Sequence, residues 1–288
     1  MAKYVPDILS RRWVIVSPQR VSRPGHGPKK QVCPLCPGNE KMTPPEVLRF
    51  GEGEKDQKGW KVRVVPNKYP ITDLHEVIVH TPFHDKAIED LPLPQIELIF
   101  KAYRHRYNFH RKTGQVLIFC NHGEHAGASL KHPHSQLVVI PSQINLDTVS
   151  REPLNNVVDE NNFFHVYCPD FSQWPYEVWI APKKVGGVFG DLTDEEINDL
   201  ASIIQKIIRK LRKIYDEHHL SNLPFGYNYY IYPKENWYVR VIPRFVQRAG
   251  FELGTGLYVN VIDPLEASLE LKGVDGKMAK VLTKLKKY

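Results

Sequence analysis

The chain of 288 residues lacks any apolar run that could form a bilayer-spanning helix, and its start, MAKYVPDILSRRW, lacks the charged-then-apolar pattern of a secretory signal. These two absences predict a cytoplasmic protein without a membrane partner. Cysteine is also scarce, with only four residues in the chain. Two of them, Cys33 and Cys36, form a close pair, which in a cytosolic protein is more often a metal site or redox motif than a disulfide.

The sequence also lacks one feature that binding of nucleic acid requires, although its charge would allow such a partner. A net charge of +7 and a pI near 9.1 suit anionic partners such as nucleotides, sugar phosphates or nucleic acid, but charge alone does not choose among them. No face interleaves aromatic side chains with Lys and Arg, as binding of single strands requires. We therefore expect no nucleic-acid partner. With 42% hydrophobic and 25% charged residues, the chain can bury the core of one large or two medium domains.

The stretch LKHPHSQLVVIP, residues 130–141, is the most informative part of the sequence. Its second half is an apolar, β-branched run stopped by proline, which is typical of a buried strand. Because side chains alternate along a strand, His132, His134 and Gln136 are predicted to share one face. Pro133 cannot donate to a β-ladder, so the histidines should lie at the strand's first residues or on a sheet edge. The alternative interpretation is two surface histidines beside a core strand.

Strand and helix patterns occur twice in the same order. The first half predicts a strand from His75, a helix from Pro94, a strand from Val116 and then the strand with the two histidines. The second half predicts a strand from Tyr176, a helix that starts with a capping box at Thr193, and strands from Tyr227 and Trp237. This pseudo-repeat predicts two domains, residues 1–150 and 151–288, joined in the polar stretch SREPLNNVVDENN. Only the first half holds the HxHxQ pattern, so we expect one reaction centre per chain.

The spacing of CPLCPGN matches a knuckle that grips zinc through two thiolates. Cys33 and Cys36 would supply half of a tetrahedral set. Among the thirteen histidines, His84 and His132 are the best candidates for the other two ligands, since both are expected at strand ends. A Cys2His2 set fills all four positions of a tetrahedral zinc, so the metal would stabilise the fold and would not activate water. The alternative is a pair of thiols in a loop without a metal.

Four motifs, CPLCPGN, VRVVPNKYP, HEVIVHTPFHD and FCNHGEHAGASLKHPHSQ, resemble in order the signatures of the galactose-1-phosphate uridylyltransferase family, a double-domain branch of the histidine triad superfamily. In the second half, AGFELGTGLYVN resembles the family's hexose-binding segment more loosely. The resemblance implies an α+β fold of two histidine-triad-like domains. Each would be an antiparallel sheet with packed helices, and the zinc and the nucleophile would belong to the N-terminal domain.

The resemblance also implies roles for individual residues. His134 matches the family's nucleophile and Gln136 its phosphate contact, while one structural zinc ion per chain would be held by Cys33, Cys36, His84 and His132. The implied substrate contacts are Arg20 and Arg23 near the phosphates, Asn121, Gly127 and Ser129 in the phosphate pocket, Asn67 on the nucleoside side, and Glu252 at a sugar hydroxyl. Some relatives hold a second metal with histidines of the second half, but YIYPKENWYVRVIPRF contains none.

The chemistry of these residue types fits nucleotidyl transfer. A neutral imidazole can attack the α-phosphorus of a nucleoside diphosphate sugar and release a sugar 1-phosphate. Gln136 can donate hydrogen bonds to phosphoryl oxygens but carries no titratable proton with which to activate water, and in the superfamily glutamine at this place accompanies transfer. The leading hypothesis is therefore a galactose-1-phosphate uridylyltransferase that exchanges UMP between UDP-glucose and galactose 1-phosphate by ping-pong transfer through His134.

Two alternatives remain open at this point. The first is a related adenylyltransferase or phosphorylase that acts on an ADP-sugar or dinucleoside polyphosphate with inorganic phosphate as acceptor. Lys68 and the sequence FELGTG depart from the family pattern where such an enzyme would differ. The second, a zinc-stabilised nucleic-acid-binding protein, explains neither Gln136 nor the order of the Cys and His residues. Because the family is usually dimeric, with the partner chain completing the hexose pocket, we also expect a homodimer.

Overall fold

The computed structural model describes residues 2–7, 12–22, 32–146, 151, 153–218 and 224–286. The chain forms two compact units. Unit 1 consists of Met1–Cys120, Ser129–Thr148 and Phe189–Leu192, and unit 2 of Asn121–Ala128, Val149–Val188 and Thr193–Tyr288. The predicted boundary between residues 150 and 151 remains a prediction. Among the helices of the described residues, none combines the length and apolar composition needed to cross a membrane.

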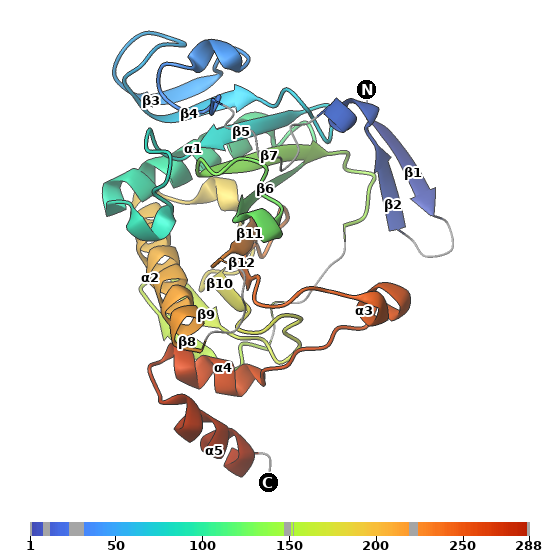
Figure 1. Ribbon diagram of the computed structural model, residues 1–288, viewed down its shortest axis with the longest axis vertical. Coiled ribbons are helices and arrows are strands. Elements are labelled where there is room, and N and C mark those ends of the chain that lie inside the picture. The colour runs from blue at the N-terminus through green and yellow to red at the C-terminus, as the bar shows by residue number, and fades with distance from the viewer. Residues whose placement is uncertain are drawn as a thin grey trace. The chain divides into compact units, whose positions relative to one another are not determined.

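Unit 1 is an antiparallel sheet with one long helix (Figure 1). Its strands lie in the order β3-β4-β5-β7-β6 and have the bounds β3 Leu48–Gly51, β4 Trp60–Pro66, β5 His75–Val79, β6 Gln115–His122 and β7 His134–Ile140. The helix α1, Leu93–His110, starts with proline in its first turn and buries the face that carries Ile96, Ile99 and Phe100. A separate hairpin pairs β1, Lys3–Asp7, with β2, Arg12–Val16. The last two residues of β6 are grouped with unit 2.

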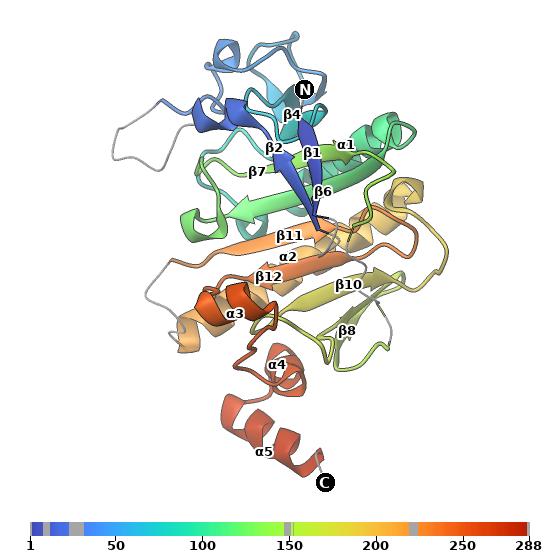
Figure 2. The same ribbon diagram turned by 90° about the vertical axis from the view of Figure 1, so that its right-hand side faces the viewer.

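Unit 2 repeats this plan (Figure 2). Its strands lie in the order β11-β12-β10-β9-β8 and have the bounds β8 Val157–Glu160, β9 Phe164–Tyr167, β10 Val178–Pro182, β11 Tyr227–Ile231 and β12 Val239–Pro243. The helix between β10 and β11 is α2, Asp194–His218, and three shorter helices follow: α3 Gly250–Thr255, α4 Pro264–Leu271 and α5 Gly276–Lys286. In each unit, three meandering strands are followed by a helix and by two strands that insert in reversed order. The predicted α+β pseudo-repeat is confirmed.

The start of α2 shows how the sequence encodes an element of this fold. The Thr193 hydroxyl accepts the Glu196 N–H at 3.2 Å, and the Glu196 carboxylate accepts the Thr193 N–H at 2.7 Å, which is the predicted capping box. The predicted apolar stripe of the helix is buried along its whole length and comprises Ile197, Leu200, Ile204, Ile207, Ile208 and Leu211. Burial of this stripe, more than helix propensity, stabilises a helix of this kind.

In unit 1 the strand β7 lies between β5 and β6, so the segment with the histidines is an interior strand. All seven of its side chains are buried. The strand begins at His134, directly after Pro133, whose carbonyl accepts the His80 N–H at 3.1 Å. Proline therefore stands at the strand's entrance, as the sequence predicted, and the edge-strand alternative is wrong.

Candidate active site

The first candidate catalytic residue, His134, opens β7 and is 8% exposed. Its Nδ1 lies 2.8 Å from the carbonyl oxygen of His132. Because a carbonyl can only accept, Nδ1 must carry the imidazole proton, and the lone pair of the neutral ring is on Nε2. The hydrogen bond fixes both the tautomer and the plane of the ring, which is the preorganisation that a nucleophile needs.

The second candidate, Gln136, lies two residues further along β7 and is opposite Val77 of β5. Its side-chain oxygen Oε1 lies 3.0 Å from Nε2 of His75, a buried residue at the start of β5. The amide nitrogen of Asn67 lies 3.1 Å from the same Nε2 atom. Unit 1 therefore brings together Gln136 and Asn67, to which the family resemblance assigns contacts on the phosphate and nucleoside sides of the substrate, and it adds His75 between them.

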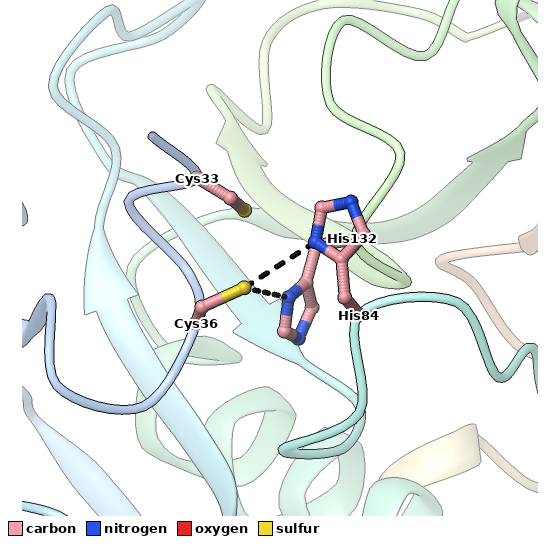
Figure 3. A group of neighbouring side chains, drawn as sticks. All are labelled: Cys33, Cys36, His84 and His132. Atoms are coloured by element: carbon pink, nitrogen blue, oxygen red, sulfur yellow. Dashed lines mark hydrogen bonds between the residues drawn. The ribbon is translucent and has the colours of Figure 1, made fainter. Parts of the chain in front are cut away.

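A second cluster in unit 1 consists of Cys33, Cys36, His84 and His132, whose potential ligand atoms all lie within 4.8 Å of one another. Figure 3 shows the Cys36 thiol directed at both imidazole rings; its Sγ lies 3.3 Å from His84 Nδ1 and 3.5 Å from His132 Nδ1. These are the four residues predicted as metal ligands in the sequence analysis. The group could hold one metal ion.

The environment of this cluster sets the state of its ligands. His132 is fully buried, and its Nε2 donates to the Thr81 carbonyl at 2.7 Å, so the lone pair of the neutral ring is on Nδ1, the atom nearest Cys36. Burial, with smaller effects of the neighbouring His84 and His134, lowers the pKa of His132 to about 4. Burial and the adjacent Cys36 thiol raise the pKa of Cys33 to about 11. A bound cation would reverse the second effect, because it stabilises the thiolate.

The predicted substrate contacts are distributed over both units. In unit 1, Arg20 lies in the short helix Pro18–Ser22 and donates to the Tyr69 carbonyl at 2.8 Å, and Ser129 is partly exposed. Arg23 lies outside the described residues. The Asn67 side-chain oxygen accepts the Tyr69 N–H at 2.8 Å. The same short segment, residues 67–69, thus holds Arg20 and Asn67 in defined conformations.

In unit 2, Asn121 is the penultimate residue of β6, and Gly127 belongs to the glycine-bearing loop that follows this strand. Gly123 and Gly127 have φ angles of 92° and 87°, a backbone region in which a residue with Cβ is strained. The loop is held by Asn228 of β11, whose amide nitrogen donates at 2.8 Å both to Asn121 Oδ1 and to the Ala126 carbonyl. Asn228 was missed by sequence reasoning, although it is the polar amide in a strand, YNYYI, that otherwise consists of tyrosines and one isoleucine.

Glu252 lies in the first turn of α3, also in unit 2, where its carboxylate accepts the Ala249 N–H at 3.0 Å. That backbone hydrogen bond lowers the pKa of Glu252. The observed role of the side chain is thus to cap the helix N-terminus.

Comparisons with known proteins find relatives that share sequence and fold with this chain. The family model described as galactose-1-phosphate uridyl transferase, N-terminal domain, matches residues 72–140, which contain His84, His132, His134 and Gln136. An ADP-glucose phosphorylase from Arabidopsis thaliana is 27% identical over 93% of this chain and 92% of its own length. A galactose-1-phosphate uridylyltransferase from Thermotoga maritima is 26% identical over 92% of this chain and 96% of its own.

The crystal structure of an Arabidopsis thaliana ADP-glucose phosphorylase with bound ADP-glucose has 26% sequence identity and a TM-score of 0.71, and the match covers 96% of this chain and 100% of that one. Fold and site together therefore resemble those of two-unit, histidine-triad-like proteins. Within that class, the chain is related to the galactose-1-phosphate uridylyltransferases, and the resemblance seen in its motifs is confirmed.

Proposed function

We propose that this protein is a nucleotidyltransferase that moves UMP between hexose 1-phosphates, converting UDP-glucose and galactose 1-phosphate into UDP-galactose and glucose 1-phosphate. The observation that carries the proposal is the geometry of β7. It begins with a histidine whose Nδ1–H is held by a carbonyl and whose Nε2 bears the lone pair, and it continues two residues later with an amide. The nucleophile is thus oriented, while its neighbour cannot act as a general base toward water.

The reaction would proceed in two displacements. His134 Nε2 attacks the α-phosphorus of UDP-glucose, the bond from that phosphorus to the bridging oxygen breaks, and glucose 1-phosphate leaves with the bonding electron pair. The leaving group is a phosphate whose second pKa is about 6, so its departure needs little protonation. Galactose 1-phosphate then attacks the uridylyl-histidine from solution and releases His134. Gln136 would stabilise the phosphoryl oxygens in both steps.

We further propose one structural zinc ion per chain, bound by Cys33, Cys36, His84 and His132. The separations of 3.3 and 3.5 Å between Cys36 Sγ and the two Nδ1 atoms are close to the edge of a tetrahedron with Zn–S and Zn–N bonds of about 2.3 and 2.1 Å, which is roughly 3.6 Å. A filled Cys2His2 set would have a structural role. It would hold His132 in place, and the His132 carbonyl would in turn orient the ring of His134. Thiolate ligation fits a reducing compartment, and we place the protein in the cytoplasm.

The remaining site residues are proposed as substrate contacts. Arg20 and Arg23 would bind the phosphates, together with Asn121, Gly127 and Ser129. Asn67 would contact the nucleoside, and Glu252 a sugar hydroxyl.

A second candidate activity is phosphorolysis of an ADP-sugar, which would use the same His134, Gln136 and zinc. The observation that favours it is the similarity to the Arabidopsis thaliana ADP-glucose phosphorylase, which extends over more than nine-tenths of both chains. The two activities share the covalent step and differ in the base and in the acceptor.

One experiment separates these activities. The protein is incubated with UDP-glucose or with ADP-glucose without acceptor, and its intact mass is measured for an added uridylyl or adenylyl group. The labelled protein is then challenged with galactose 1-phosphate or with inorganic phosphate. Uridylyl label removed by the sugar phosphate supports the uridylyltransferase, and adenylyl label removed by phosphate supports the phosphorylase. If neither nucleotide sugar labels the protein, nucleotidyl transfer through His134 is wrong.

We also propose that the protein is a homodimer. The segment at and after α3 exposes several large apolar side chains, namely Phe251, Leu253, Leu257, Tyr258 and Val259, and such patches are typical of association surfaces. Light scattering coupled to gel filtration should give twice the chain mass of 33.3 kDa. The variant Leu253→Asp should lower that mass toward one chain.

A further inference from the structure

The ring of His75 is held from one side by the backbone of its own unit. His75 is 4% exposed, and its Nδ1 lies 2.9 Å from the Ile71 backbone nitrogen. A backbone N–H can only donate, so Nδ1 must present a lone pair. In the neutral ring the single proton is therefore on Nε2, and that nitrogen is a hydrogen-bond donor.

The Nε2–H group of His75 faces two carboxamides. The oxygen of Asn67 is already the acceptor of the Tyr69 N–H at 2.8 Å, and it is the nitrogen of Asn67 that lies 3.1 Å from Nε2. A nitrogen that bears two hydrogens cannot accept. The acceptor left for Nε2–H is Gln136 Oε1 at 3.0 Å. The backbone orientation at Ile71 thus determines, through one imidazole, which end of the Gln136 amide faces His75.

We infer that His75 is a positioning residue for nucleotidyl transfer: it holds the oxygen of Gln136 and so leaves the amide N–H groups as the end that can donate to the phosphoryl oxygens. This inference rests on the proposed function. Rotation of the amide by 180° would turn its oxygen toward an anionic phosphoryl group, which exchanges a favourable hydrogen bond for a repulsion.

A matched pair of substitutions tests this role. Gln at position 75 places an amide nitrogen near the position of Nε2 and keeps a donor there, whereas Glu has the same size but presents only acceptors when ionised. We expect His75→Gln to label with nucleotide at a rate close to that of the wild type. His75→Glu should turn the Gln136 amide and slow labelling by about 10- to 100-fold, the effect of misplacing a catalytic group. Equal rates for the two variants would overturn the inference.

A double-mutant cycle separates positioning from a general structural effect. His75→Ala should slow labelling in the wild-type background and change little once Gln136→Ala has removed the group that it positions. As a control we choose His110→Ala, which also removes a buried histidine from unit 1 but lies against Glu76 and Arg106, away from Gln136. Its effect on the rate should be the same in both backgrounds. Additivity of His75→Ala with Gln136→Ala would refute positioning.

A measurement without substrate makes the outcome independent of the proposed function. The ¹⁵N spectrum of the His75 ring should show a protonated Nε2 and an unprotonated Nδ1, and the side-chain amide resonance of Gln136 should shift in His75→Glu and stay in place in His75→Gln. The opposite tautomer would overturn the inference even if the protein transfers nucleotide. A wild-type protein that shows the expected tautomer but never labels would instead refute the proposed function and leave the hydrogen bond established.

Discussion

Units 1 and 2 share one strand order and differ in the residues at the start of their last strands. The strand β7 with the proline after it ends in VVIP, and β12 ends in RVIP. Alignment on these prolines sets His134 against Asn236 and Gln136 against Tyr238, and the two residues of unit 2 lie just before β12. Asn236 has a φ angle of 56° and accepts the Gly186 N–H at 2.9 Å in a turn before the strand. Tyr238 is 1% exposed and stacks on Trp179 with a centroid distance of 4.0 Å. Where unit 1 has a histidine and a glutamine fixed by hydrogen bonds, unit 2 has a turn and an aromatic core.

This comparison shows that the strand order of a unit does not depend on the polar residues proposed for the reaction, because unit 2 has the same order without them. Aromatic stacking of Tyr238 with Trp179 and Tyr232 stabilises in unit 2 a strand whose counterpart in unit 1 carries hydrogen-bonded polar side chains. A few positions can therefore be devoted to reaction in one copy while the other copy keeps the fold. The two copies also provide each prediction with a matched control.

The largest effect is expected at the pair His134 and Asn236. His134→Gly should reduce nucleotidyl transfer by on the order of 10⁶-fold, as removal of a covalent nucleophile does, and should keep the thermal transition, because the side chain contributes little to the apolar core. Asn236→Gly keeps a residue suited to positive φ and should leave the rate within a factor of about two. Intact mass and single-turnover rates measure both. Labelling of His134→Gly would contradict the mechanism.

The pair Gln136 and Tyr238 should separate chemistry from stability. Gln136→His adds a titratable imidazole beside the nucleotidyl-histidine, so we expect slower transfer and hydrolysis of the nucleotide sugar that is faster by roughly 10²–10⁴-fold. Tyr238→Ala should instead lower the free energy of unfolding by about 3–5 kcal/mol through a cavity in the aromatic core. Phosphate release and denaturant unfolding of both variants are the measurements. A Gln136→His variant that neither hydrolyses nor labels would speak against the role of Gln136.

The cysteines of the two units should respond differently to metal. Cys36→Ala should abolish zinc binding, and at free zinc about a thousandfold above Kd the loss corresponds to about 4 kcal/mol of stability. Cys168→Ala removes a fully buried thiol of unit 2 and should keep one zinc per chain. Metal content by mass spectrometry and the shift of Tm on chelation report the difference. If a strong chelator leaves the wild-type Tm unchanged, the proposal of a metal site is wrong.

The smallest effect concerns a buried ion pair of unit 1. The Glu76 carboxylate is bound by Arg106 at 2.6 and 2.9 Å and by His110 at 3.0 Å. Burial alone would raise the pKa of Glu76, but the hydrogen bonds from His110 and Arg106 hold it below the ordinary value of 4.5. The stability that the carboxylate contributes is therefore full above pH 4.5 and is lost as the pH falls through the lowered pKa.

Glu76→Gln should accordingly lower the free energy of unfolding by about 2–3 kcal/mol at pH 7 and by less in strong acid. Urea unfolding between pH 3 and pH 7 measures this difference. In unit 2 the comparable buried pair is Glu177 and Arg240, whose atoms approach to 2.7 Å, and Glu177→Gln provides the matched variant. A Glu76→Gln loss that does not shrink in acid would exclude ionisation as its cause.

The sequence predicted the elements whose apolar patterns are complete and missed those that depend on distant partners. The strands β5, β6, β7, β10, β11 and β12 and both long helices were expected, but β3, β4, β8 and β9 were not. The strand β4 contains Arg63, a fully buried cation that interrupts the apolar pattern and is stabilised by Glu46 at 2.7 Å and Asp56 at 2.8 Å. Such a charge is tolerated only because its partners fold around it, which a local pattern does not reveal.

The same limit applies to the site. The two histidines, the glutamine and the metal group could be nominated because they stand in short, ordered motifs. The contact of His75 with Gln136 joins residues 61 positions apart and depends on the register of β5 against β7. Periodicity indicates that two strands exist, but it does not say which of their side chains meet.

The Cys and His cluster also has a consequence for the order in which the chain folds. Cys36 and His132 are 96 residues apart in sequence, and Cys36 and His84 are 48 apart. Closing a loop of 96 residues costs about 4 kcal/mol of chain entropy by the logarithmic law, and most of unit 1 lies within that loop. A metal ion that bound all four side chains would tie together strands that otherwise meet only by diffusion. Refolding with zinc should therefore be limited by this closure, and chelation should slow the return of unit 1 more than that of unit 2.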